Sequence, residues 1–87
     1  MVSMNPNALR ITRAVPRHVI EARVRRALAR DGAVLRKTRP GNTWAKIDLG
    51  DYFTVDSHTG FPDRRHLDLD ELARELFVLK PFEVIAD

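Results

Sequence analysis

Cysteine is absent from this sequence of 87 residues, and that absence excludes several classes of small protein. Disulfide scaffolds need paired cysteines, and zinc fingers and iron–sulfur proteins use cysteine sulfur as a metal ligand. Glycine is scarce, at four residues, and no glycine-rich phosphate-binding loop occurs. We therefore expect a protein without a disulfide, a metal site or a cofactor.

Long apolar runs are missing as well. No stretch approaches the roughly 20 apolar residues that a membrane-spanning helix needs. Residues 1–13 are polar and lack the apolar core of a secretory signal. We expect a cytoplasmic protein that does not bind a membrane. It should consist of a flexible N-terminal segment, residues 1–15, and a single domain, residues 16–87.

No arrangement typical of an active site is present either. The three histidines, His18, His58 and His66, are far apart and match no metal-binding spacing. Ser57 directly precedes His58, and such adjacency does not orient a hydroxyl toward a base. A core built from so few residues encloses a substrate pocket only with difficulty. These features favour a protein that is not an enzyme.

Residues 17–31 have the pattern of an amphipathic helix. Ile20, Val24 and Leu28 recur at helical spacing and form one apolar stripe. Gly32 follows at the place where a helix commonly ends in a left-handed residue. The sequence therefore predicts a helix that buries this stripe in the core.

Three strands are predicted after this helix, and a short fourth strand around residues 64–66 fits the pattern less well. The three strands span residues 33–39, 44–49 and 52–56. Within the second, Ala45 and Ile47 alternate with polar residues, as in a half-buried strand. Within the third, Phe53 and Val55 are expected to face the core.

A second helix is predicted to begin after Asp68, because Glu71 follows three residues later as in a capping box. Its apolar residues have helical spacing, and the helix should end at Lys80, since Pro81 follows. We expect an α+β fold with two layers and the order α-β-β-β-α. An antiparallel three-stranded meander would carry both helices on one face.

Charge is distributed unevenly along the chain. Residues 1–46 hold eleven Lys and Arg against two acidic residues, a net charge of +9. Residues 47–87 hold four basic and ten acidic residues, a net charge of −6. Nine of the eleven early cations are arginine, which forms planar, bidentate contacts with phosphate or carboxylate. This asymmetry indicates a charged partner.

The basic residues suggest a nucleic-acid-binding face on the first helix and the strand after it. Helical spacing gathers Arg23, Arg26 and Arg30 within about one quadrant of the helix surface, whereas Arg25 lies on the opposite flank of the apolar stripe. The candidate contact residues are Arg23, Arg26, Arg30, Arg36, Lys37 and Arg39. Such a face could follow a phosphate backbone. The alternative is that these arginines only keep the exposed side of a small helix soluble.

Two aromatic residues could add to this surface. Trp44 and Tyr52 are expected to project from the sheet face opposite the core, where they would be exposed beside Lys46. Exposed aromatic side chains can stack on bases or anchor a protein partner. The alternative is a cross-strand pair that simply stabilises the sheet.

Three segments of the chain resemble parts of a known group of proteins. They read RRALARDG at 25–32, LGDYFTVD at 49–56 and DLDELARELFVLKPFE at 68–83. The chain is similar here to short, uncharacterised proteobacterial proteins that are often encoded near plasmid or integrative-element genes. The resemblance implies a bacterial, cytoplasmic accessory protein. The group has no assigned activity and points to no functional residue.

These observations lead to two hypotheses of different class. The first is a non-enzymatic binding module that docks on nucleic acid or a nucleoprotein through its arginine-rich face. The second is a protein-interaction module, either a homodimer or a mobile-element protein that inhibits a host complex. In that case the basic face would meet an acidic surface. The choice depends on whether the basic and acidic halves neutralise each other after folding.

Overall fold

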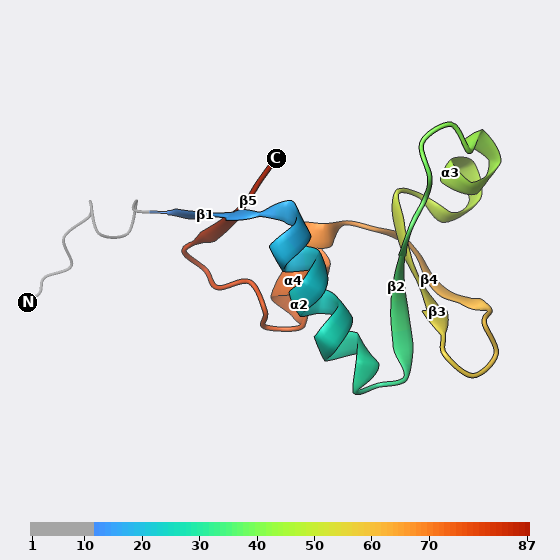
Figure 1. Cartoon of the computed structure of the whole chain (residues 1–87), viewed down its shortest axis with the longest axis horizontal. Helices are drawn as coiled ribbons and strands as arrows, with labels where there is room; N and C mark the ends of the chain where they lie inside the picture. Colours follow the sequence, from blue (N-terminus) through green and yellow to red (C-terminus); the bar gives the residue numbers. More distant parts are fainter. Residues whose placement is uncertain (1–11) are drawn as a thin grey trace, which may run out of the picture.

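The structure is a computed structural model and describes residues 12–87 (Figure 1). It is an α+β fold with three helices, a three-stranded antiparallel sheet and a separate pair of parallel strands. The elements are β1 (Arg13–Pro16), α2 (Arg17–Ala29), β2 (Ala33–Lys37), α3 (Thr43–Leu49), β3 (Tyr52–Asp56), β4 (Pro62–Leu67), α4 (Leu69–Glu75) and β5 (Glu83–Ala86).

The core lies between α2, α4 and the inner side chains of the sheet. Ile20 and Val24 on α2 and Ala73 on α4 are fully excluded from solvent. They belong to one cluster with Leu35 of β2 and Tyr52 of β3. The apolar stripe predicted for the first helix is therefore confirmed. Figure 1 shows α2 lying between the β1–β5 pair and the three-stranded sheet.

The antiparallel meander is confirmed, but one of its strands was wrongly assigned. The order is β2-β3-β4, so that Tyr52–Asp56 is the central strand and Pro62–Leu67 the outer one. The segment 44–49, predicted as a strand, is instead part of helix α3. The weaker prediction of a strand around 64–66 is the one that the structure bears out.

Helix α3 forms because both of its ends are specified locally. The side chain of Asn42 accepts a hydrogen bond from Ala45 N, and Gly50 follows the helix with a φ of 79°. An alternating pattern and a short helical pattern cannot be separated over so few residues. On the helix, Ala45 and Leu49 are half-buried, whereas Ile47 is exposed.

The prediction for β3 holds at Val55, which is buried, but it is wrong for Tyr52, which was expected on the exposed face. Tyr52 and Thr54 are buried, with 6% and 1% of their surface exposed, whereas Phe53 is only half-buried. A polar contact holds Tyr52 in the core, since its Oη donates a hydrogen bond to Glu21 Oε2 on α2 at 2.7 Å. The expectation that Tyr52 is an exposed contact residue is thus wrong.

Helix α4 begins as predicted and ends earlier than predicted. The carboxylate of Asp68 accepts hydrogen bonds from the backbone of Asp70 and Glu71. The helix stops at Glu75 rather than continuing to Lys80, because Phe77 turns into the left-handed region with a φ of 60°. The residues that follow form a loop that leads into β5.

Strands β1 and β5 bring the two ends of the described chain together. Arg13 pairs with Glu83 and Pro16 with Ala86 in a parallel register. Residues 1–11 of the predicted flexible segment lie outside the described residues. Residues 13–15, which the prediction placed in that segment, belong to strand β1.

Candidate functional site

Most of the basic residues between 12 and 46 line one of two depressions that have no lining residue in common. One lies beside α2, α4 and the loop after it, and the other lies between β2 and α3. Of the six predicted contact residues, Arg23, Arg26 and Arg30 line the first depression. Lys37 and Arg39 line the second, and Arg36 lines neither. The six residues therefore do not form one continuous patch.

We call the first depression the arginine hollow. Its volume is about 610 Å³, within the range of about 300–1,000 Å³ that is typical of ligand sites. One wall is the exposed side of α2, and the opposite wall is the loop between α4 and β5. The lining residues are Arg13, Arg23, Arg26, Ala27, Arg30, Leu76, Phe77, Val78, Lys80 and Glu83.

The loop wall of the arginine hollow is held by Arg74. Its guanidinium donates hydrogen bonds to the backbone carbonyls of Lys80 at 3.2 Å and of Glu83 at 2.9 Å. The same side chain forms an ion pair with Asp70 on α4 at 2.8 Å. Because Arg74 ties helix and loop together, the shape of the hollow is built into the fold.

Glu83 is the one carboxylate among the residues that line the hollow, and it is already engaged. Only 2% of its surface is exposed, and it accepts hydrogen bonds from Lys80 N at 2.9 Å and from Arg23 Nη1 at 3.1 Å. The backbone hydrogen bond from Lys80, together with the Arg23 guanidinium, lowers the pKa of Glu83 despite its burial. Arg23 also donates to Val78 O at 3.1 Å, so it works as a structural clamp.

The other four cations of the hollow have no such partner. Within residues 12–87, no ion pair is formed by Arg13, Arg26, Arg30 or Lys80. Arg26 and Arg30 are exposed and stand four residues apart on one helix, where like charges repel. The dipole of α2 stabilises cations near the C-terminal end of the helix. An anion bound between the two guanidinium groups would in addition remove their mutual repulsion.

Phe77 stands at the rim of the arginine hollow. It lines the depression, and yet 91% of its surface is exposed. Sequence analysis missed this residue because the apolar pattern of 69–80 was interpreted as a single longer helix. It also missed Arg13 and Lys80, which reach the hollow only through tertiary structure.

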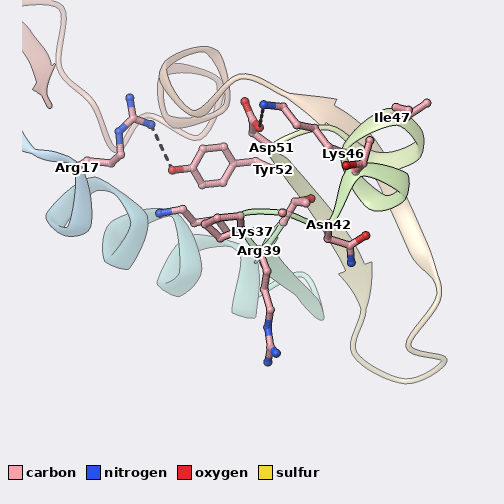
Figure 2. A pocket seen from close by; sticks show the side chains of 12 residues that line it. Arg17, Lys37, Arg39, Asn42, Lys46, Ile47, Asp51 and Tyr52 are labelled. Carbon is pink, nitrogen blue, oxygen red and sulfur yellow. Dashed lines mark hydrogen bonds and ion pairs between the residues drawn. The ribbon is translucent and has the colours of Figure 1, made fainter.

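The second depression, which we call the basic groove, has a volume of about 550 Å³ and is shown in Figure 2. Its cations are mostly neutralised. Arg17 pairs with Asp87 at 2.6 Å, Lys37 with Glu21 at 3.6 Å and Lys46 with Asp51 at 3.7 Å. Arg39 has no ion pair within the described chain and points away from Tyr52 in the figure.

A polar network connects Arg17, Lys37 and Tyr52 of the basic groove with Glu21 on α2. Tyr52 Oη accepts a hydrogen bond from Arg17 Nη1 at 3.2 Å, drawn in Figure 2. It also donates one to Glu21 at 2.7 Å. Burial alone would raise the pKa of Glu21, but the hydrogen bond from Tyr52 and the charge of Lys37 hold it below its ordinary value. Burial and the hydrogen bond to Glu21 raise the pKa of Tyr52. Because every member has a partner, this network serves to join α2 to the sheet.

The predicted exposure of Trp44 is confirmed, although on a helix instead of a strand. Trp44 is 83% exposed and Ile47 66% exposed, on the outer side of α3. Tyr52 does not accompany Trp44, since it is buried under α2. The predicted aromatic pair is therefore not formed.

Comparison with other proteins identifies no relative: no family model, no curated protein and no solved structure matches the chain. Among residues 12–87 there is no group of three His, Asp or Glu side chains placed to hold a metal ion. None of the helices in this part of the chain has the length and apolar character needed to span a membrane. The features of the described residues that bear on function are therefore the two basic depressions and the exposed apolar side chains.

Proposed function

We propose that the protein is a non-enzymatic binding module that docks on nucleic acid, or on a nucleoprotein, through the arginine hollow. The observation that carries this proposal is the group of four cations around a preformed depression. Arg13, Arg26, Arg30 and Lys80 form no ion pair within the described residues, and the single carboxylate of the hollow is already bound by Arg23 and Lys80 N. Neutralising phosphates with such cations releases counterions, which is a major source of affinity for nucleic acids.

The arginine hollow suits phosphate better than the basic groove does. In the groove, three of four cations already have a carboxylate partner, and a phosphate would have to displace it. In the hollow, the unpartnered guanidinium groups of Arg26 and Arg30 can offer bidentate contacts at no such cost. We therefore assign binding to Arg26 and Arg30 with Arg13 and Lys80, and a supporting role to Arg23.

The test is a binding titration with matched charge reversals. The double variant Arg26→Glu/Arg30→Glu should lose most of its affinity for an oligonucleotide. The control Arg36→Glu/Arg39→Glu changes the net charge equally but lies outside the hollow, and it should bind nearly as well as the wild type. Equal losses in both variants would mean that net charge alone, and not the hollow, attracts the nucleic acid.

Salt dependence gives a second reading of the same site. Each phosphate contact contributes about 0.7 to 0.9 to the slope of log K against log salt concentration. Replacing Arg26 and Arg30 by glutamine should therefore reduce that slope by about 1.4 to 1.8. Binding that does not depend on salt, or no binding to any DNA or RNA, would refute the proposal.

A second candidate function is protein interaction through α3. The observation that favours it is the pair of exposed apolar residues Trp44 and Ile47, since exposed apolar patches are characteristic of contact surfaces. The partner would be a second copy of the chain or an acidic protein. Light scattering at low and high salt tests the first case: a dimer that Ile47→Asp dissociates supports it, and a monomer at both salts excludes it.

Two further proposals concern how the helices cover the sheet and where the protein acts in the cell. We propose that α2 and α4 cover the same face of the three-stranded sheet in two layers, because their core residues share a cluster with Leu35 and Tyr52. We also propose a cytoplasmic accessory role associated with a mobile element. That setting follows from the resemblance of segments 25–32, 49–56 and 68–83.

A further inference from the structure

We infer that the arginine hollow takes single-stranded nucleic acid, and that Phe77 stacks on one of its bases. This inference rests on the proposed function and adds to it the class of partner. Two independent features of Phe77 point to it: the almost complete exposure of its ring and the strained backbone that holds the ring at the rim of the hollow.

The ring of Phe77 does not take part in the packing of the core. Its ring is 91% exposed, whereas the neighbouring Leu76 and Val78 are half-buried against the core. An apolar ring in water gains nothing from folding, so its position does not serve the core. At the rim of a cationic depression, however, such a ring can meet the face of a base while cations contact the phosphates.

The backbone at Phe77 would suit glycine better. Phe77 N donates to Arg74 O at 3.1 Å and Val78 N donates to Ala73 O at 2.9 Å, the hydrogen bonds of a Schellman motif. In this motif the residue with positive φ is usually glycine, because a side chain is strained there. The chain instead carries phenylalanine at a φ of 60°. A bulky, exposed side chain in a strained conformation indicates a role outside the fold.

The geometry favours a single strand over a duplex. In a duplex the base faces are stacked on each other, so an exposed ring could reach them only by opening a base step. A single strand can turn a base toward Phe77 while its backbone follows Arg26 and Arg30, which are about 6 Å apart along the helix axis. The cations and the ring lie on one side of the domain and could contact the same short stretch of strand.

The experiment measures binding of the whole chain to short oligothymidylate and oligouridylate strands and to a duplex of equal length. We expect both single strands to bind more tightly than the duplex. Phe77→Ala should weaken single-strand binding by about 5- to 150-fold, the effect of losing one stacked base, and should hardly change duplex binding. Phe77→Trp should bind the single strand at least as well as the wild type.

Phe61 supplies the matched control. It is also an exposed phenylalanine, at 72%, but it lies in the loop between β3 and β4 and not in the hollow. Phe61→Ala should leave single-strand affinity unchanged. An equal loss in Phe61→Ala and Phe77→Ala would show that general stickiness, rather than stacking in the hollow, is being measured.

The outcomes separate this inference from the proposed function. Salt-dependent binding that Arg26→Glu/Arg30→Glu abolishes and Phe77→Ala leaves intact overturns the stacking role and keeps the hollow as a phosphate site. Tighter binding to duplex than to single strand overturns the inference in the same way. If no nucleic acid binds at all, both the inference and the proposed function fail.

Discussion

Replacing Phe77 by glycine should make the protein more stable while it weakens binding to a single strand. The exposed ring buries almost no apolar surface, so removing it costs little in the core. The two hydrogen bonds that close α4 come from backbone groups and would remain in the variant. What changes is the conformational strain at a φ of 60°.

The magnitude follows from two opposing terms. A left-handed conformation costs an L-residue about 1–2 kcal/mol, and glycine escapes this cost. Glycine loses more backbone entropy on folding, and this loss lowers the stability by about 0.5–1 kcal/mol. The net gain should be about 0.5–1 kcal/mol. In a domain of this size, 1 kcal/mol corresponds to a shift in Tm of about 4–8 °C, so an increase of about 2–8 °C is expected.

Thermal unfolding followed by circular dichroism measures this shift, with Phe77→Ala as the comparison. Alanine keeps its Cβ and therefore most of the strain, so its Tm should stay close to that of the wild type. The reasoning is refuted if Phe77→Gly lowers the Tm, or if alanine and glycine raise it equally. In the first case the ring would contribute to packing, and in the second the left-handed strain would not be the cause.

Three further perturbations test how the fold is held together. Tyr52→Phe removes the hydroxyl that donates to Glu21 and should cost about 2 kcal/mol in denaturant unfolding. Because the lowered pKa of Glu21 contributes stability that is lost as the pH falls below about 4, Tyr52→Phe should lose less stability than the wild type between about pH 6 and pH 3. Gly50→Ala should destabilise by about 2–4 kcal/mol, since its Cβ would lie 2.8 Å from the Cα of His66. Gly41→Ala has a similar φ and open space, so it should cost only about 1 kcal/mol in the same urea titration.

Features that are specified locally could be predicted from the sequence. The stripe of α2, the strand Tyr52–Asp56 and the cap at Asp68 all depend on residues within a few positions of one another. Helix α3 also has local signals, at Asn42 and Gly50, but both residues suit turns equally well. The apolar alternation then favoured the wrong period for the segment between them.

Features that depend on distant contacts could not be predicted. No short-range pattern indicates that Arg13–Pro16 pairs in parallel with Glu83–Ala86, because the two strands are at opposite ends of the domain. The hydrogen bond between Tyr52 and Glu21, which holds Tyr52 in the core, also joins two separate elements. A tyrosine that alternates with apolar residues fits either face of a strand until its partner is known.

The candidate site illustrates the same division. Helical spacing alone places Arg23, Arg26 and Arg30 on one surface, and the structure brings these three together. Arg36 and Arg39 are separated from them because the chain reverses at Gly32 and β2 runs back beside β3. Three of the six predicted contact residues, Arg36, Lys37 and Arg39, therefore lie outside the hollow.

The hollow keeps its positive charge because several carboxylates of the acidic half form ion pairs at other places in the domain. Asp70, Glu75 and Asp48 pair with arginines of their own half, at 2.7–3.0 Å. Glu21, one of the two acids in the basic half, is buried against Tyr52. Among the described residues that line the hollow, Glu83 is the acidic one, and it is held by Arg23 and the backbone of Lys80. The charge asymmetry of the sequence therefore survives folding in the hollow, where four cations without an ion pair line one depression, and this is why a charge reversal there should differ from the same reversal at Arg36 and Arg39.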